Sequence, residues 1–189
     1  MREGGVRVLT VAGLWNSGPE HWQTYWERER GDCARVQQDD WDRPKRADWV
    51  ARLEVAVAAA EGPVVLAAHS LGCATVAHWA GESDPAVRDK VIGALLVAPS
   101  DVEAPLYPEG TEGFKPMPLA PLPFPTIVVA STDDEYVTVD RAAEFARAWG
   151  ARLEVAGALG HINSSSHLGM WTQGQAWLDE LVAGGRATV

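Results

Sequence analysis

Residues 63–72 read PVVLAAHSLG, and this stretch decides the fold class. The run Pro63–Ala68 is continuously apolar, which is typical of a strand buried on both faces of a parallel sheet. The run Leu71–Gly81 that follows favours a helix. A buried strand therefore leads through a short turn into a helix, and Ser70 lies at that turn.

The same alternation of strands and helices continues along the chain. We predict strands over Val6–Ala12, Ala34–Gln38, Pro63–Ala68, Val91–Ala98, Thr126–Ala130 and Arg152–Val155. We predict helices over Pro19–Arg30, Arg46–Ala60, Leu71–Gly81, Val139–Trp149 and Met170–Val182. Such βαβ units have right-handed crossovers that place helices on both faces of a sheet. We therefore expect one α/β domain over residues 1–189, a three-layer α/β/α sandwich around a mainly parallel sheet of about six strands.

A proline-rich segment, residues 99–125, interrupts this alternation because it holds eight of the twelve prolines. Proline lacks a backbone N–H and restricts the residue before it, so we expect neither helix nor strand here. The segment follows the carboxyl end of a strand, where binding loops lie in such sheets. It is either an irregular connection or a small cap over a pocket.

Charge and composition exclude several classes of function. The chain has 16 basic and 26 acidic residues and a net charge of −10, which is the wrong sign for a nucleic-acid binder. The first predicted strand–helix turn, residues 13–18, lacks the G-x-G-x-x-G pattern of dinucleotide-binding domains. The two cysteines, Cys33 and Cys73, do not have zinc-site spacing, so we expect no metal and no cofactor.

No stretch approaches the roughly 20 apolar residues of a membrane-spanning helix. Residues 1–14 do not have the long apolar core and small-residue cleavage site of a secretory signal peptide. We therefore expect a cytoplasmic protein that does not act at a membrane.

The turn itself, Ala68-His69-Ser70-Leu71-Gly72, resembles the G-x-S-x-G nucleophile elbow of the α/β-hydrolase fold, with alanine in place of the first glycine. This strained turn projects a serine hydroxyl above the sheet and needs small residues on both sides. It also places the N–H of Leu71 at a helix N-terminus, where it can donate to an oxyanion. The alternative is that Ser70 only caps the helix.

A serine nucleophile needs a histidine base and a carboxylate that orients it. His161 follows the last predicted strand, which suits the order serine, acid, histidine of this fold. Asp134 follows the strand Thr126–Ala130 and is the favoured acid, with Asp133 as the alternative and Asp101 a second position. The simpler interpretations are that these acids lie in a solvated loop and that His161 is a solvent-exposed loop histidine.

The loop Gly13–Asn16, after the first strand, is the candidate source of a second oxyanion donor. Glycine permits a tight turn there, and the N–H of Leu14 or Trp15 could point into the site. Trp15 and Asn16 are candidate walls of a substrate pocket. The loop could equally be a plain strand–helix connection.

Four blocks carry a family resemblance: LWNSGPEHWQ (residues 14–23), AHSLG (68–72), STDD (131–134) and GHIN (160–163). In order and spacing they resemble the small retinoblastoma-binding-type serine hydrolases, notably the bacterial branch. The resemblance implies a minimal α/β-hydrolase fold that lacks the first two strands, and a triad of Ser70, Asp134 and His161. The L-x-C-x-E motif of the family's partner binding is not carried over, because residues 71–75 read LGCAT and have threonine in place of the acid.

We therefore expect a serine hydrolase that cleaves small carboxylic esters, or amides, through an acyl-enzyme on Ser70. The expected partner is the small-molecule substrate. Two alternatives keep the fold: a binding module with a catalytically weak site, and an acyltransferase that passes the acyl group to another acceptor. The oligomeric state does not follow from the sequence.

Overall fold

Six parallel strands form one sheet in the computed structural model, which describes residues 5–186. The strands are β1 Arg7–Val11, β2 Cys33–Arg35, β3 Val64–His69, β4 Val91–Val97, β5 Thr126–Ala130 and β6 Arg152–Val155. They lie in the order β2-β1-β3-β4-β5-β6, and each neighbouring pair is parallel. The predicted α/β fold, with helices on both sides of a sheet of about six strands, is confirmed.

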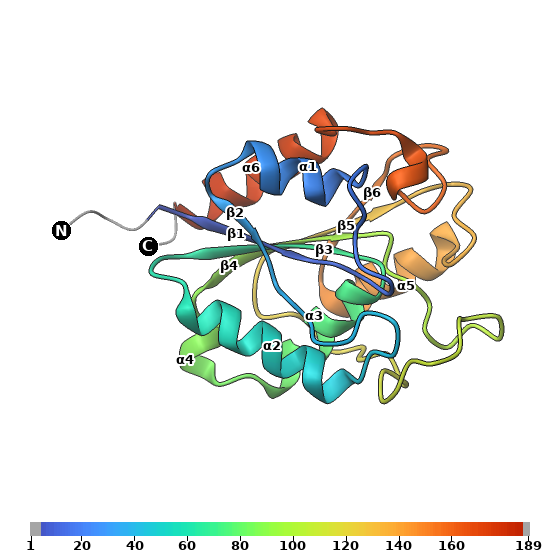
Figure 1. Ribbon diagram of the computed structural model, residues 1–189, viewed down its shortest axis with the longest axis horizontal. Coiled ribbons are helices and arrows are strands. Elements are labelled where there is room, and N and C mark those ends of the chain that lie inside the picture. Colours follow the sequence, from blue (N-terminus) through green and yellow to red (C-terminus); the bar gives the residue numbers. More distant parts are fainter. Residues whose placement is uncertain (1–4, 187–189) are drawn as a thin grey trace.

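Helices cover both faces of the sheet (Figure 1). On one face lie α1 Trp22–Glu29 and α6 Thr172–Arg186, and on the other lie α2 Arg46–Ala59, α3 Leu71–Glu82, α4 Pro85–Arg88 and α5 Val139–Trp149. Among residues 5–186, no helix has both the length and the apolar character that crossing a bilayer requires.

Each face of the sheet has its own apolar core. Side chains alternate along a strand, so Leu9 and Val11 of β1 pack into the core under α2 and α3, whereas Val8 packs into the core under α1 and α6. The buried Trp49 belongs to the first core and the buried Trp22 to the second. This two-sided burial explains why the central strands are continuously apolar in sequence.

Several predicted boundaries are wrong. Helix α1 begins at Trp22 and not at Pro19, because His21 is its N-cap: His21 Nδ1 accepts a hydrogen bond from the N–H of Gln23. Strand β2 is shorter than predicted and begins earlier, at Cys33.

The last helix, α6, is shifted from the predicted Met170–Val182 and runs to Arg186. Gly185 lies inside it, and a Cβ there would come within 2.5 Å of Ile92 Cδ1. Glycine usually signals a helix end, but here it allows a close approach of α6 to the sheet. The short helix α4 and the 3₁₀ turn Ser164–Ser166 were not predicted, because three or four residues show no periodicity.

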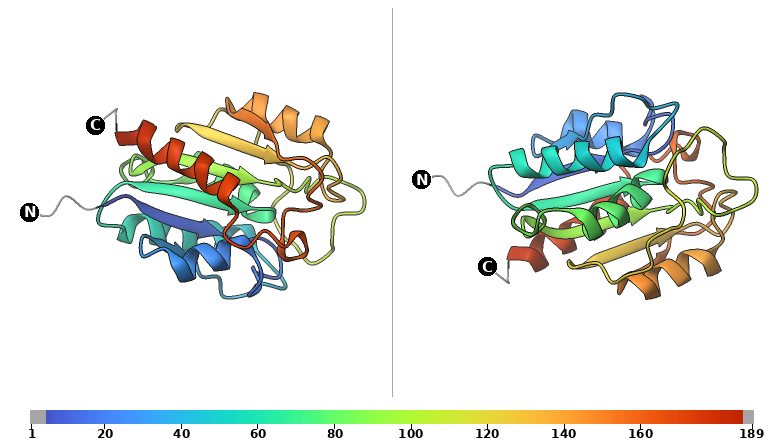
Figure 2. Two further views of the ribbon diagram at one scale, coloured as in Figure 1. Left: turned by 90° about the horizontal axis from the view of Figure 1, so that it is seen from above. Right: turned by 90° about the horizontal axis from the view of Figure 1, so that it is seen from below.

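The carboxyl ends of all six strands lie at one edge of the sheet, since the strands are parallel. The chain turns from β1 toward β2 on one side and from β3 toward β4 on the other, so the strand order reverses between β1 and β3. Ligands bind at such a switch point in open α/β sheets. The proline-rich segment contains no helix or strand beyond an isolated bridge between Lys45 and Glu112, and it extends past this edge (Figure 2).

Candidate active site

Ser70 lies at the turn from β3 into α3, in a backbone conformation that is rare for a residue with a side chain (φ 56°, ψ −124°). The Ser70 N–H donates to the carbonyl of Val97 at 3.0 Å, which ties the turn to β4. A Cβ at Gly72 would lie 2.1 Å from the carbonyl oxygen of Val11, so only glycine fits there. Packing against β1 and β4 therefore holds the strained turn that the sequence motif predicts.

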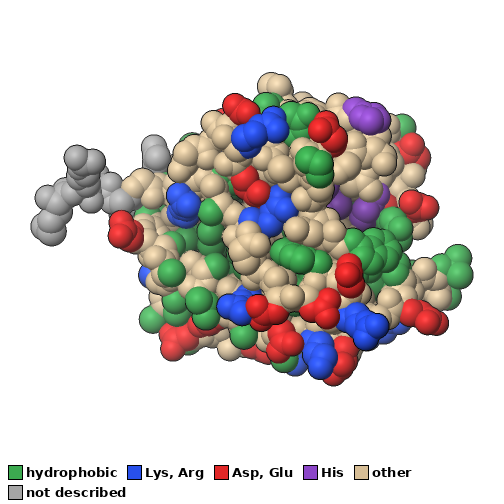
Figure 3. Space-filling view, in the orientation of Figure 1, with side chains coloured by type: hydrophobic (Ala, Val, Ile, Leu, Met, Phe, Trp, Pro, Cys, Tyr) green, Lys and Arg blue, Asp and Glu red, His purple; other side chains and the backbone are tan. Residues whose placement is uncertain are grey.

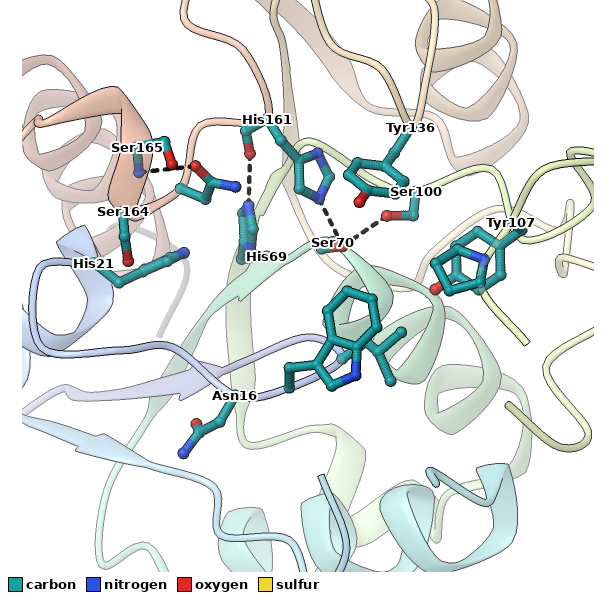
Figure 4. A pocket seen from close by; sticks show the side chains of 14 residues that line it. Asn16, His21, His69, Ser70, Ser100, Tyr107, Tyr136, His161, Ser164 and Ser165 are labelled. Atoms are coloured by element: carbon teal, nitrogen blue, oxygen red, sulfur yellow. Dashed lines mark hydrogen bonds between the residues drawn. The ribbon is translucent and has the colours of Figure 1, made fainter. Parts of the chain in front are cut away.

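The predicted serine, histidine and acid meet above this turn, and Figure 4 shows the first two, Ser70 and His161. His161 Nε2 lies 2.8 Å from Ser70 Oγ. On the other side of the ring, His161 Nδ1 lies 2.9 Å from each carboxylate oxygen of Asp134. The Asp134 side chain is fully buried, so water does not compete for this contact.

The two alternative acids have other hydrogen-bond partners and do not hydrogen-bond to the His161 ring. Asp133 Oδ1 accepts hydrogen bonds from the Gly160 N–H at 2.7 Å and from Ser131 Oγ at 2.8 Å. These bonds, and above all the one from the Gly160 N–H, lower the pKa of Asp133. The same bonds hold the loop before His161 in place. Asp101 instead pairs with Arg141 at 3.2 Å.

The two predicted oxyanion donors lie on neighbouring loops. The Leu71 N–H opens α3, so no carbonyl of its own helix is in position to accept from it. The Leu14 N–H has no acceptor within residues 5–186, whereas the Trp15 N–H donates to the Trp41 carbonyl and is occupied. A Cβ at Gly13 would lie 3.1 Å from the Leu71 nitrogen, which shows how closely the two loops approach.

Arg35 of β2 supports the loop that carries Leu14. Its guanidinium donates to Asn16 Oδ1 and to the Ser17 carbonyl, both at 2.8 Å, and pairs with Glu27. Asn16 also lines the cavity above Ser70, but its side-chain oxygen accepts from Arg35. This partly buried network holds the loop in place.

A cavity of about 190 Å³ opens above Ser70. Its walls come from five stretches of the chain: Leu14, Trp15, Asn16 and His21; His69 and Ser70; Ser100, Tyr107 and Pro108; Tyr136; and His161, Asn163, Ser164 and Ser165. None of these is Asp, Glu, Lys or Arg. Trp15 is 58% exposed at the mouth, and Figure 3 shows histidine side chains beside a group of hydrophobic ones on this face.

Sequence reasoning missed Ser100, whose Oγ lies 2.6 Å from Ser70 Oγ. Ser100 is buried and follows the carboxyl end of β4, which is the signal that could have found it. It also missed His69, whose Nε2 donates to the carbonyl of His161 at 2.8 Å. Burial lowers the pKa of His69 well below its usual value, so this imidazole is neutral and positions the His161 backbone.

Comparison with known proteins adds the family. The family model described as serine hydrolase matches residues 8–180 of this sequence. The chain belongs to the serine hydrolase family. No match among curated proteins is found for this serine hydrolase. Within residues 5–186 it has no group of three or more His, Cys, Asp or Glu side chains that could hold a metal ion.

Solved structures similar to this serine hydrolase share its fold. A protein of Pectobacterium atrosepticum described as a YdeN-like hydrolase is 28% identical, with a TM-score of 0.82 over 95% of this chain and 91% of the other. The ydeN gene product of B. subtilis is 16% identical, with a TM-score of 0.70 over 94% and 98%. A thermophilic esterase of Thermogutta terrifontis is 16% identical, with a TM-score of 0.68 over 95% and 91%.

Proposed function

We propose that this serine hydrolase cleaves small carboxylic esters through an acyl-enzyme on Ser70. The observation that carries the proposal is the hydrogen-bonded chain from Ser70 Oγ through His161 to the buried Asp134. A serine hydroxyl becomes a nucleophile when a positioned imidazole takes its proton and a carboxylate holds that imidazole in one tautomer. Amides with good leaving groups fit the same chemistry.

In the first step His161 Nε2 accepts the Ser70 proton as Ser70 Oγ bonds to the substrate carbonyl carbon. The carbonyl oxygen becomes an oxyanion and accepts from the N–H groups of Leu71 and Leu14. When the tetrahedral intermediate collapses, the C–O bond to the alcohol breaks and the alcohol leaves with the proton from His161. Asp134 keeps the other ring proton on Nδ1 and stabilises the imidazolium.

In the second step water replaces the alcohol. His161 Nε2 takes one proton from a water molecule as its oxygen attacks the acyl carbon. The bond to Ser70 Oγ then breaks, Ser70 regains its proton from His161, and the carboxylic acid leaves. Each backbone donor to the oxyanion is worth on the order of 10² to 10³ in kcat.

Ser100 has a positioning role in this proposal. Because Ser70 donates its proton to His161, the contact at 2.6 Å is one in which the Ser100 hydroxyl donates to Ser70 Oγ. That bond selects the Ser70 rotamer that points at His161.

The proline-rich segment acts as a small cap in this proposal. Tyr107 and Pro108 of the segment line the cavity together with Leu14, Trp15 and Asn16. A cavity of about 190 Å³ is smaller than the roughly 300–1,000 Å³ of drug-sized ligand sites, which favours short acyl chains.

Within the family, the blocks at residues 14–23 and 160–163 favour the retinoblastoma-binding type. Its partner motif has no accessible counterpart, since residues 71–75 are buried in α3.

The test is turnover of p-nitrophenyl acetate together with mass measurement, at early times, of the intact protein and of its proteolytic peptides. We expect an initial burst of nitrophenol and a mass increase of one acetyl group on the peptide that contains Ser70. His161→Ala should abolish both. A protein that binds the ester without turnover would be a binding module, and a dominant amide product in the presence of an amine would make it an acyltransferase.

A further inference from the structure

Tyr136 is a tyrosine of the cavity wall whose side chain the proposed mechanism does not use. Its backbone N–H donates to Asp134 Oδ1 at 2.8 Å, and its carbonyl accepts from the Asp101 N–H at 3.1 Å. Its ring packs against the ring of His161, with the two ring centroids 4.5 Å apart. Contacts of the backbone and of the ring therefore hold this side chain in one place beside His161.

The Tyr136 hydroxyl is unpaired and accessible. Of the hydrogen bonds within residues 5–186, the two that involve Tyr136 both use its backbone, so its hydroxyl has no partner in the described part of the chain. The residue is only partly buried, and its oxygen is not among the buried polar atoms that lack a partner. The hydroxyl is therefore open to the cavity that Tyr136 lines, where it can donate one hydrogen bond and accept others.

This hydroxyl lies beside the position of the leaving alcohol. Figure 4 shows the Tyr136 ring next to His161, with the hydroxyl directed toward Ser70. In the proposed mechanism His161 Nε2, which is 2.8 Å from Ser70 Oγ, gives its proton to the oxygen of the leaving alcohol. The carbon atoms attached to that oxygen then lie close to the ring that packs against His161. A polar group two or three carbons along the alcohol can reach the Tyr136 hydroxyl.

The wall of the cavity selects an uncharged partner for this hydroxyl. None of the lining residues is Asp, Glu, Lys or Arg, so an ionised group on the alcohol would lose water without gaining a counterion. Most of the lining side chains are neutral hydrogen-bonding groups, namely those of serine, asparagine, histidine and tyrosine. A purely apolar alcohol would displace water from the Tyr136 hydroxyl without replacing its hydrogen bond. An alcohol that carries a second hydroxyl replaces that bond.

We propose that the Tyr136 hydroxyl hydrogen-bonds to a second, uncharged oxygen in the alcohol half of the substrate. The substrate class is then short-chain esters of diols and other small polyols, with a free hydroxyl two or three carbons from the ester oxygen. The cavity of about 190 Å³ keeps both halves of the ester small. This inference deepens the proposed esterase function and rests on it for the reaction, but not for binding.

The test compares isosteric ester pairs on native protein and on Tyr136→Phe. Phenylalanine removes only the hydroxyl, and it keeps the backbone bond to Asp134 and the packing against His161. The alcohol-half pairs are 2-hydroxyethyl acetate with propyl acetate, and 2,3-dihydroxypropyl acetate with 2-methylbutyl acetate. One acyl-half pair, p-nitrophenyl hydroxyacetate with p-nitrophenyl propanoate, reports on the other side of the ester.

The readout is the ratio of kcat/KM within each pair, because the intrinsic reactivities of the two esters cancel when native protein and variant are compared. For at least one alcohol-half pair, we expect native protein to favour the hydroxyl-bearing ester about 3- to 10-fold more than Tyr136→Phe does, the value of one neutral hydrogen bond. The matched control is Tyr25→Phe, the same change at a tyrosine outside the cavity wall whose hydroxyl donates to Glu20. It should keep the native ratios.

Equal ratios in native protein and Tyr136→Phe for both alcohol-half pairs would overturn the proposal. A uniform loss of activity with unchanged ratios is one such result, and it would mean that Tyr136 acts only on His161. A change confined to the acyl-half pair is another, because it would place the acyl half of the ester at this hydroxyl.

A binding experiment separates this inference from the esterase proposal. Ser70→Ala is titrated with intact 2,3-dihydroxypropyl acetate and with 2-methylbutyl acetate, and binding is followed by the NMR signals of the ester. Adding Tyr136→Phe should weaken binding of the first ester about 3- to 10-fold and leave that of the second unchanged. That result without turnover by native protein would retain the subsite and reject the esterase. Turnover by native protein with equal binding in both variants would retain the esterase and reject the subsite.

Discussion

Asp134→Asn should lower kcat by about 10⁴-fold while the fold is kept. The Tyr136 N–H donates to Asp134 Oδ1 at 2.8 Å, so the amide oxygen of the asparagine has to occupy that position. Its NH₂ group then takes the place of Oδ2, which is 2.9 Å from His161 Nδ1. Oδ1 is also 2.9 Å from Nδ1 but already accepts from the Tyr136 N–H. The NH₂ donor therefore favours the tautomer with the ring proton on Nε2, which faces Ser70 and then cannot accept its proton.

This loss corresponds to about 5.5 kcal/mol of transition-state stabilisation, the cost of a wrong histidine tautomer in a serine triad. The assay is kcat and KM for p-nitrophenyl acetate, with thermal unfolding as the check on folding. Asp133→Asn is the matched control, because asparagine Oδ1 can still accept from Gly160 and Ser131, and it should keep kcat within about threefold. A larger loss in Asp133→Asn than in Asp134→Asn would refute this account of His161.

Three further predictions concern other contacts. Ser100→Ala should lower kcat about 3- to 10-fold with little change in KM, because one neutral hydrogen bond to the Ser70 oxygen is lost; an unchanged kcat would remove its positioning role. Gly72→Ala should destabilise by more than about 2 kcal/mol in urea unfolding, since its Cβ would meet the Val11 carbonyl oxygen at 2.1 Å; native stability would contradict this. Below pH 6.5 His21 becomes protonated in the unfolded chain but stays neutral in the folded protein, where its pKa is about 3. His21 should therefore lower the free energy of unfolding as the pH falls, by about 2 kcal/mol at pH 5 relative to pH 8. In His21→Asn the free energy of unfolding should decline less steeply with falling pH.

Much of the fold follows from local pattern. Continuous apolar runs such as residues 64–68 identify strands that are buried on both faces, and the alternation of such strands with helices predicts a parallel sheet covered by helices. The same logic brings the candidate site together. Ser70, Asp134 and His161 follow β3, β5 and β6, and parallel strands end at one edge of the sheet.

The remaining features depend on contacts that sequence spacing does not encode. Ser100 is one serine in an irregular segment until β4 pairs with β3 and brings it beside Ser70. Histidine is an unusual N-cap residue, so the sequence pattern assigns His21 to the helix itself. Nothing in that pattern indicates that His21 lines the cavity. Asp133 and Asp134 are adjacent in sequence, and only their different partners in the folded loop distinguish them.

The central claim is that Ser70 is an activated nucleophile, and covalent labelling by a fluorophosphonate probe tests it most directly. We predict one adduct per native chain, on the peptide that contains Ser70. No adduct is expected on Ser70→Ala, and labelling of His161→Ala should be much slower. A native protein that takes up no probe, or Ser70→Ala labelled as fast as native protein, would contradict the account.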